Sequence, residues 1–369
     1  MNRAESLLIV GNSVRYLAQS ASRGGYAVTG VDLFSDEDTQ AACHTAVKTV
    51  RQDAEGLVDV CLGQDMVANT AWIYGAGFEA EPERLQQLES LGRCLGNSPR
   101  TLMLLSQPAS FFPLLDDLAI SYPRVSFRRP RKPCGWLRKV VGSYGGLGVR
   151  YAQTDAPDNR VHYFQRLIPG PVCSLTFLAD GSEIEVLGIN ELHAVDPGLG
   201  DFRFSGVYSR FNQGDGHRRQ MIDMARKLTG SLQLRGANGI DCVFEGDQVL
   251  LLELNARTPA TLELYEQALP DGGVAAHIAA CNGTLSELSL EGQAQGYRVY
   301  YAEQDQRVGR VSWPDWCSDR PPAGTYCLKG APVCGLHATG NSSIEVAGLL
   351  QERLEQIRSL VALSNQEAA

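Results

Sequence analysis

The chain has 369 residues, of which 44% are hydrophobic and 20% charged, and its formal net charge is −9 at pH 7. This length predicts two or three packed modules, and the ordinary composition predicts a chain that folds throughout. The acidic balance argues against nucleic acid or anionic lipid as a partner. No apolar run is long enough for a signal peptide or a membrane span, so we expect a cytoplasmic protein without membrane contact.

The ten cysteines and six histidines are scattered along the chain, and no two cysteines have Cys-x-x-Cys spacing. In a cytosolic chain of this size the scatter favours free, buried thiols over disulfides or a zinc site. Candidate functional residues are therefore sought among the carboxylates, amides and basic side chains.

The first hundred residues predict a parallel α/β domain. An apolar run at 6–10 stops at Gly11, a helical pattern follows as far as Gly24, and a second strand covers 26–33. This β-α-β order is typical of a parallel sheet. The turn after the first strand lacks the second and third glycines of a dinucleotide fingerprint, so a structural Rossmann-like domain is favoured over nicotinamide binding.

The middle of the chain predicts a change of architecture. Residues 101–121 predict linker helices, and the proline-rich segment 123–133 marks a boundary, because proline continues neither a helix nor a central strand. Further elements are then expected in this order: antiparallel strands at 136–141, 161–167, 172–178 and 183–190, a glycine-rich loop at 196–208, a helix at 218–232, strands around Asp241 and Leu251, a helix from about Leu262, a strand at 297–302 and a closing helix at 344–363.

The strongest chemical signal is an apolar strand that carries Glu253, Asn255 and Arg257. Strand side chains alternate between faces, so these three must project together. Carboxylate and amide oxygens suit Mg²⁺, and a guanidinium beside them suits phosphate. The alternative is a hairpin whose polar side chains face only solvent, although that gives the three groups no common purpose.

Asp241, on the preceding strand, joins this group only in one register. A hairpin loop of Gly246-Asp247-Gln248 predicts Asp241 directly opposite Glu253. A two-residue turn would pair Asp241 with Leu252 and would spoil the arrangement.

The second signal is Lys139, near the end of a strand and followed by a loop that contains Gly145, Gly146 and Gly148. A strand lysine can place its ammonium on phosphates while backbone N–H groups fold over them. The order of residues is not that of a P-loop, because the lysine precedes the loop. A plain hairpin turn explains the glycines about as well.

The third signal is the apolar strand 163–170, which contains Gln165 and Leu167 and ends in a turn. Backbone groups of such a hinge can bind adenine while apolar walls enclose the ring. A purely structural strand is an equally good interpretation.

In this order, the lysine with its glycine loop, the hinge, and Asp241 with Glu-x-Asn-x-Arg resemble the ATP-grasp superfamily over most of the chain. The resemblance implies an N-terminal Rossmann-like parallel α/β domain followed by an ATP-grasp fold of two α+β subdomains. The implied units are an N-terminal domain at 1–100, a helical linker at 101–130, a small subdomain with the glycine loop at 131–190, a large subdomain with the metal site at 191–290 and a C-terminal segment packed on it at 291–369. The amino-acid sequences of 136–148 and 200–206 are similar to those of carboligase-like members of the superfamily. Some of these members are associated with C1-carrier coenzymes.

The resemblance also implies a function. ATP would lie between two antiparallel sheets, with Lys139 and Arg257 as the catalytic cations and Mg²⁺ (or Mn²⁺) on Asp241, Glu253 and Asn255. Nucleotide contacts are implied at Gly145, Gly146, Gly148, Gln165 and Leu167. The implied activity is ligation of a small carboxylate to an amine or a thiol through an acyl phosphate, with release of ADP and phosphate, in coenzyme biosynthesis for example. A kinase and a non-catalytic nucleotide-binding protein are the alternatives, and a homodimer is a common assembly in the superfamily.

Two departures from the family pattern concern the nucleotide contacts. A lysine expected upstream has no counterpart, with Lys132 the nearest, and Val140 stands where proline is usual. The substrate carboxylate has candidate ligands in His193, Arg203 and Arg210, which flank the predicted glycine-rich loop, but charged loop residues are more often simply solvated.

Overall fold

The N-terminal part of the chain is a parallel sheet with the strand order β3-β2-β1-β4. The computed structural model describes residues 5–65, 69–154, 159–212, 214–286 and 292–367. The elements of this part are β1 (Ser6–Val10), α1 (Arg15–Arg23), β2 (Ala27–Asp32), α2 (Glu37–Ala42), β3 (Thr45–Lys48), α3 (Ala54–Leu62) and β4 (Ala71–Tyr74). Leu7 and Ile9 pack into one hydrophobic cluster and Leu8 and Val10 into another, as expected for a strand covered on both faces. The predicted parallel α/β domain is confirmed.

Three helical segments connect this sheet to the rest of the molecule. They are the 3₁₀ helix η1 (Pro82–Ser90), α4 (Pro99–Ser106) and α5 (Pro108–Asp117). Ser98 accepts a hydrogen bond from the Thr101 N–H and Pro99 follows it, so α4 begins with a capping residue and a proline in the first turn. The helices expected in this stretch are therefore present.

The next unit is a small antiparallel sheet with the strand order β5-β8-β6-β7. Its strands are β5 (Val125–Ser126), β6 (Trp136–Val140), β7 (Val149–Tyr151) and β8 (His162–Arg166). The proline-rich segment that we expected to be only a boundary thus supplies one strand. Proline is tolerated beside it because β5 lies at the edge of the sheet.

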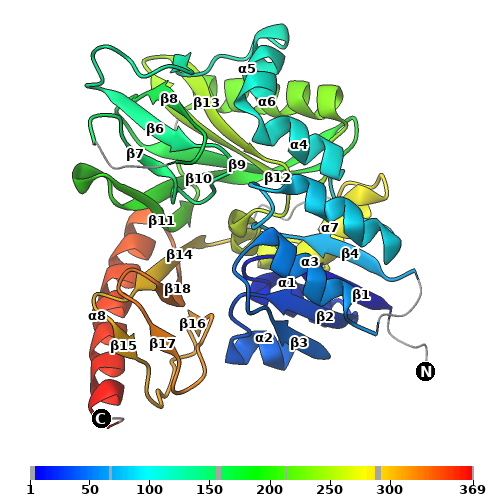
Figure 1. The fold of residues 1–369 in the computed structure, drawn as a ribbon, viewed down its shortest axis with the longest axis vertical. Helices are drawn as coiled ribbons and strands as arrows, with labels where there is room; N and C mark the ends of the chain where they lie inside the picture. The colour runs from blue at the N-terminus through cyan, green and yellow to red at the C-terminus, as the bar shows by residue number, and fades with distance from the viewer. Residues whose placement is uncertain (1–4, 66–68, 155–158, 213, 287–291, 368–369) are drawn as a thin grey trace.

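The largest sheet has eight strands in the order β13-β12-β9-β10-β11-β14-β18-β16. Its strands are β9 (Val172–Asp180), β10 (Ile184–Asp196), β11 (Asp201–Ser209), β12 (Arg235–Glu245), β13 (Gln248–Asn255), β14 (Ala294–Tyr301), β16 (Cys317–Ser318) and β18 (Pro332–Gly340). The remaining elements are η2 (Pro197–Leu199), α6 (Asp215–Leu232), η3 (Ala260–Ala268), α7 (Gly272–Cys281), β15 (Gln306–Arg307), β17 (Tyr326–Cys327) and α8 (Ser343–Glu367). β14, β18 and β16 extend the sheet into the C-terminal part (Figure 1).

The glycine-rich loop predicted at 196–208 is wrong, since most of this stretch is strand β11. Gly200 ends the short η2 turn with a φ of 80°, which favours glycine. Gly206 lies within the strand, where a Cβ would come within 2.7 Å of the Tyr297 carbonyl oxygen on β14. The second glycine therefore marks a close approach of two strands and not a loop.

The two faces of the large sheet have different surroundings. Leu175 and Phe177 on β9 pack into one hydrophobic cluster with Met221 of α6. Thr176 points to the other face, where its hydroxyl lies 2.6 Å from the hydroxyl of Thr261 on η3. This second face looks toward the N-terminal domain and the small sheet, and the candidate site lies on it.

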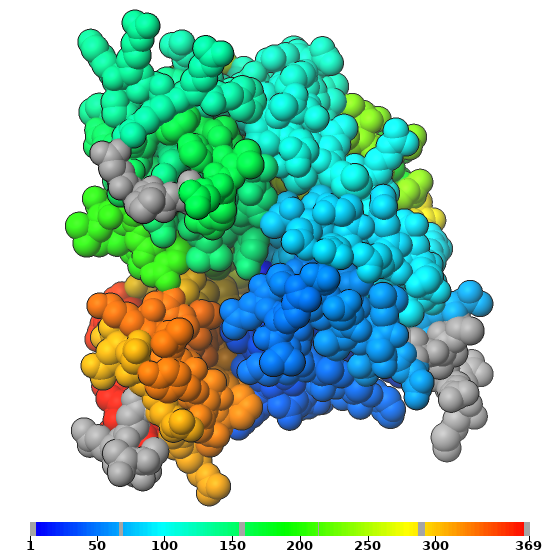
Figure 2. Space-filling model, in the orientation of Figure 1, coloured from blue at the N-terminus to red at the C-terminus, as the bar shows by residue number. Residues whose placement is uncertain are grey.

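A buried ion cluster joins three parts of the chain. Arg15 of α1 is only 4% exposed and pairs with Glu263 of η3 and with Asp319, which follows β16. Asp38 of α2 accepts a hydrogen bond from the Asp319 N–H at 2.8 Å. These contacts hold the N-terminal domain against the C-terminal part, as Figure 2 shows where the blue and orange surfaces touch. Among the described residues, no helix combines the length and apolarity that crossing a bilayer requires.

Candidate active site

The β12–β13 hairpin sets the geometry of the site. Glu245 pairs with Gln248, so of the two turn lengths that the sequence left open, the turn has two residues and not the three of Gly246-Asp247-Gln248. Asp241 nevertheless lies opposite Glu253, as predicted. The two observations agree because a β-bulge between Asp241 and Cys242 gives β13 one extra residue, Leu252.

The bulge also changes which side chains of β13 face which way. Before it, Val249 and Leu251 pack into the hydrophobic cluster on the α6 face, and after it Leu254 and Ala256 take over that role. The bulge thereby turns Glu253, Asn255 and Arg257 to the opposite face. One strand can thus bury leucines against a helix and still present a row of polar groups.

A chain of hydrogen bonds connects the polar groups of the hairpin. The Asn255 Nδ2 donates to Asp241 Oδ2 at 3.2 Å, and the Arg257 Nη2 donates to Asn255 Oδ1 at 3.1 Å. The amide oxygen of Asn255 therefore faces Arg257 in this arrangement. To join Asp241 on a shared cation, the amide must turn over.

Lys139 reaches the same cavity from the small sheet. Its Nζ donates to Gln165 Oε1 at 3.3 Å and lies 5.9 Å from the centre of the Tyr163 ring. Burial disfavours the ammonium, but Tyr163, Glu253 and Asp241 more than offset this and raise the pKa of Lys139 above its ordinary value. The lysine is thus positively charged at physiological pH.

The two carboxyl groups of the hairpin resist ionisation. Burial first, and then the charge of Glu253, raises the pKa of Asp241 to about 7. Burial also raises the pKa of Glu253, although Lys139 and Arg257 act in the opposite direction. Asp241 Oδ1 is buried and has no hydrogen-bond partner among the described residues. Such a pair of desolvated acids is most stable with an added positive charge.

The cavity between the two sheets is lined by Lys139, Glu253, Asn255 and Arg257, and Asp241 lies beside it, paired with Glu253. Its volume is about 120 Å³. It is lined from the large sheet by residues 252–257, from the small sheet by 139–143 and Tyr163, from the N-terminal domain by Gly75, Phe78 and Glu79, and from the linker helices by residues of α4 and α5. Small-molecule pockets usually measure roughly 300 Å³ or more, so the cavity would have to widen to admit a whole nucleotide.

The glycines after Lys139 are needed for packing. Gly145 and Gly146 have φ values of 55° and 73°, and a Cβ on Gly146 would come within 1.9 Å of the Phe202 carbonyl oxygen. The Gly145 carbonyl accepts a hydrogen bond from the Phe204 N–H at 2.9 Å, so the loop is seated on β11. These two glycines and Gly148 do not line the cavity, whereas the start of the loop does.

The two hinge residues predicted to contact adenine differ in their surroundings. Gln165 is 1% exposed, and its Nε2 has no hydrogen-bond partner among the described residues. The Leu167 N–H donates to the Gly135 carbonyl at 3.0 Å. A free amide donor is therefore present at Gln165, while the backbone N–H of Leu167 is already used.

Glu79, which sequence reasoning missed, closes the site from the N-terminal domain. Its Oε1 accepts from Arg257 Nε at 2.7 Å, and its Oε2 accepts from the Gly77 N–H at 2.7 Å. The side chain of Arg257 is 13% exposed and that of Glu79 is 18% exposed. The two residues are 178 positions apart, and the only local sign in the sequence is a carboxylate just after the glycine-rich turn that follows β4.

The three residues predicted to hold the substrate carboxylate are not brought together. His193 packs against Tyr208 with ring centres 4.4 Å apart and the rings tilted by 40°. Arg203 pairs with Asp201 and donates to the Gly330 carbonyl of the C-terminal part. Arg210 lines a separate pocket beside η3 and the start of α6. The upstream lysine candidate Lys132 is exposed and does not line the cavity.

The chain is similar to known proteins both in sequence and in fold. Residues 110–261 match a family described as an ATP-grasp domain. The carboxyaminoimidazole ribonucleotide synthase of Aspergillus clavatus, solved with ATP, superposes with a TM-score of 0.72 at 14% identity, over 97% of this chain and 99% of that one. The biotin carboxylase domain dimer of Hydrogenobacter thermophilus 2-oxoglutarate carboxylase, solved with MgADP, ADP and bicarbonate, gives 0.71 at 12% identity, over 92% and 87%.

A longer relative matches in part. The arginine-specific large chain of carbamoyl phosphate synthase from Bacillus subtilis (strain 168) is 22% identical over 204 residues, which is 50% of this chain. The match covers 20% of that protein, so the chain corresponds to about a fifth of its length. Two antiparallel sheets that face each other across a charged cavity, behind a parallel α/β domain, define the ATP-grasp fold. Residues 110–261 match the ATP-grasp domain, and the chain as a whole shares the fold of the nucleotide-bound structures above.

Proposed function

We propose that the protein is an ATP-dependent ligase that activates a small-molecule carboxylate as an acyl phosphate and transfers the acyl group to an amine or a thiol. The observation that carries the proposal is the convergence of Lys139, Arg257 and Glu253 on one cavity between two sheets, with Asp241 paired to Glu253 beside it. Related folds solved with ATP, or with MgADP and bicarbonate, support a nucleotide and a carboxylate-like partner as ligands.

A divalent cation fits the residues present. Asp241 has a buried oxygen without a partner, and its pKa of about 7 shows that the second negative charge is poorly compensated. Two carboxylates and one amide make an incomplete set of ligands, which is usual for Mg²⁺ because phosphates and water complete it. Asp241, Glu253 and Asn255 would hold Mg²⁺ or Mn²⁺, and the bound ion would neutralise charge on the phosphate oxygens.

The protein's part in the reaction is to bind, orient and exclude water. Lys139 would bind the phosphates that remain on ADP, and Arg257 would stabilise charge on the transferring phosphoryl group. A carboxylate oxygen of the substrate attacks the terminal phosphorus and ADP leaves. The amine or thiol then attacks the carbonyl carbon, phosphate leaves, and the nucleophile loses its proton. Glu79 fixes Arg257 from the N-terminal domain, so the position of the Arg257 charge depends on the packing of that domain.

The test is an isotope-transfer experiment. The purified chain with Mg·ATP is screened against pools of small carboxylates and amines, and carboxylates that cause ADP release are then supplied with heavy oxygen in the carboxyl group. We expect one heavy oxygen in the released phosphate, because the acyl phosphate passes that atom to phosphorus. Release of AMP and pyrophosphate, or phosphate without the label, would contradict the proposal. A stable phosphorylated product would identify a kinase instead.

A further inference from the structure

The positive charge of the chain is concentrated in one short segment. Residues 124–166 contain ten Lys or Arg and two Asp, a net charge of +8. Since the whole chain carries −9, the remaining residues carry −17. The segment spans the small sheet, from β5 to β8. Of its ten basic residues only Lys139 and Lys132 are lysines.

Most of this charge lies away from the candidate active site. Lys139 and Gln165 point to the inner face of the small sheet, so Arg166, the next residue on β8, points outward. Residues on both sides of β5 contact that outer face: Arg166 donates to the Cys134 carbonyl at 3.3 Å, and the Arg124 guanidinium lies 5.9 Å from the Trp136 ring centre.

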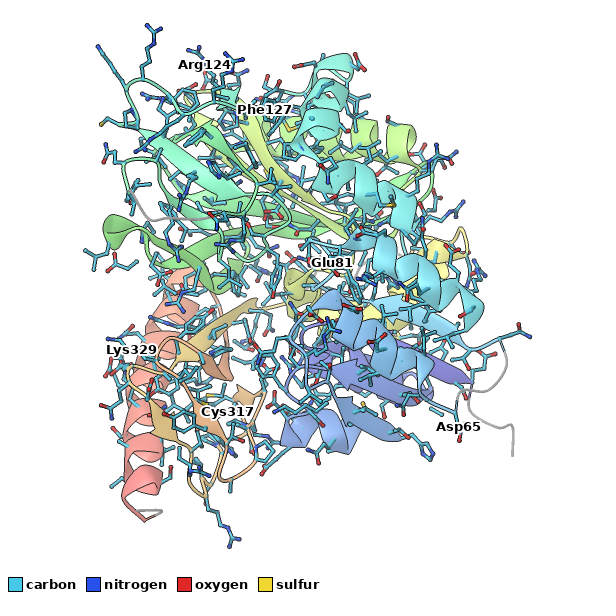
Figure 3. All side chains as sticks on the ribbon, in the orientation of Figure 1. Asp65, Glu81, Arg124, Phe127, Cys317 and Lys329 are labelled. Atoms are coloured by element: carbon cyan, nitrogen blue, oxygen red, sulfur yellow. The ribbon has the colours of Figure 1, made fainter. Side chains whose placement is uncertain are left out.

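Five exposed cations on this outer side define a basic surface. They are Arg124, Arg128, Arg131, Lys132 and Arg166. None of the five lines the cavity, and among the described parts of the chain none forms an ion pair. Phe127 lies among them with 59% of its surface exposed. Figure 3 labels Arg124 and Phe127 at the end of the molecule opposite the C-terminus, and Figure 2 shows the blue-green side chains of this region projecting there.

Like charges that form no ion pairs repel one another on a small surface, so such a cluster favours a partner that neutralises it. We propose that the basic surface binds an acidic polypeptide segment, with its carboxylates on the guanidinium groups and an apolar side chain against Phe127. Guanidinium forks match carboxylate geometry, and an exposed aromatic ring among charges is typical of an anchor in a protein–protein contact. This binding function is independent of the ligase chemistry.

Nucleic acid and membrane fit the surface less well. A long polyanion would continue past the segment onto the rest of the chain, whose −17 charge repels it within a Debye length of about 8 Å. Single-stranded binding uses several aromatic rings in series, and the stretch 124–134 offers Phe127 alone as an exposed ring. Interfacial membrane binding uses an amphipathic helix, and residues 124–134 form none.

The experiment measures binding of the full chain to fluorescein-labelled poly-L-glutamate by fluorescence anisotropy. We expect saturable binding that weakens as salt rises. The triple variant Arg128→Glu, Arg131→Glu, Lys132→Glu should bind at least about tenfold more weakly, because close charge pairs become repulsive. Phe127→Ser, which leaves the charge unchanged, should weaken binding about threefold through the lost apolar contact.

A second triple variant controls for net charge. Arg93→Glu, Arg100→Glu and Arg226→Glu reverse three exposed arginines outside the segment, so both triples carry a net charge of −15. The control should change affinity less than about twofold. Melting temperature and ATP affinity of both triples show whether the fold is retained.

Three results would overturn the proposal. The first is the absence of poly-L-glutamate binding at low salt, and the second is an equal loss of affinity in the two triples. The third is tighter binding, at the same ionic strength, of single-stranded RNA or of phosphatidylcholine–phosphatidylserine vesicles, which would assign the surface to nucleic acid or to membrane.

Discussion

Sequence patterns predict site residues in two regions, the β12–β13 hairpin and the segment from His193 to Arg210. In the structure the predicted residues lie together in the hairpin and apart in the segment. In the hairpin, Asp241, Asn255 and Arg257 form one chain of hydrogen bonds on one face. In the other segment, His193 and Arg203 turn to separate neighbours. Regular alternation along a strand is therefore a better guide to a shared site than closeness along the chain.

The two regions also differ in how their charges are balanced. Arg203 pairs with the carboxylate of Asp201. The hydrogen bond that Arg203 donates lowers the pKa of Asp201. Asp241 and Glu253 face each other with raised pKa values. A charged side chain that is paired with an opposite charge nearby stabilises the fold. Acids whose negative charge is not balanced by the protein are available to bind a cation.

The largest effect should come from Glu253→Ala. Loss of one cation ligand should lower ATP-dependent phosphate release at least about a hundredfold, a typical cost for removing one electrostatic contact at a reacting centre. The melting temperature should stay the same or rise, because one of two repelling acids is gone. The matched control is Glu245→Ala on the exposed turn of the same hairpin, which should retain activity; equal losses in the two variants would remove the distinction between the faces.

Next in size is Lys139→Ala. The lost ammonium should weaken ATP binding by about ten- to a hundredfold, measured by calorimetry in excess Mg²⁺. Arg138→Ala tests the alternation directly, since Arg138 sits on the opposite face of the same strand. ATP affinity that fell as much in Arg138→Ala as in Lys139→Ala would show that general charge, and not position in the cavity, attracts the nucleotide.

The third prediction concerns pH. The pKa of Asp241 rises from 3.8 to about 7 on folding, so its contribution to stability is complete below about 4 and is lost as pH rises through about 7. The metal-free chain should therefore melt at a lower temperature at pH 8 than at pH 6, and Mg²⁺ affinity should fall about tenfold per unit below pH 7.

Asp36 complicates this measurement and supplies its control. Burial, followed by repulsion from Asp319, raises the pKa of Asp36 to about 8, so it acts on stability in the same direction. Asp241→Asn should abolish the pH dependence of Mg²⁺ affinity, and Asp36→Asn should leave it in place. Titration of Mg²⁺ by calorimetry across this range distinguishes the two acids.

The smallest effects should follow substitution outside the hairpin. His193→Ala, Arg203→Ala and Arg210→Ala should leave ATP affinity and the KM of any identified carboxylate unchanged within about twofold. Arg203→Ala should destabilise the chain by about 1 kcal/mol in a denaturant titration, since it loses hydrogen bonds and its position 4.9 Å from the Tyr301 ring centre. A large rise in the KM of the carboxylate in any of the three would restore that residue as a substrate ligand.

Much of the fold could be predicted because periodicity and proline position determine it locally. The β-α-β unit, the helix at 218–232 and the common face of Glu253 and Asn255 follow from apolar runs and alternation. The turn could not be predicted from its residues, because a bulge elsewhere in the hairpin decides how turn length relates to register.

Other features depend on contacts between distant parts of the chain. The partnership of Glu79 with Arg257 requires two domains to meet. Gly206 serves strand packing although its neighbourhood is typical of a loop. The positive φ values of the glycines after Lys139 could be predicted from the sequence. The packing of this loop against β11 could not.

The bulge at Leu252 acts on this strand as a correction of the reading frame. In a regular ladder that kept Leu252, this leucine would stand opposite Asp241, and Glu253 would point into the leucines and methionines beneath the sheet. Deletion of Leu252 would instead join the pairs Cys242–Leu251 and Asp241–Glu253 into an unbroken ladder and leave Glu253 on the cavity face. A change of one residue in the length of this strand therefore preserves the site only where a bulge is gained or lost with it.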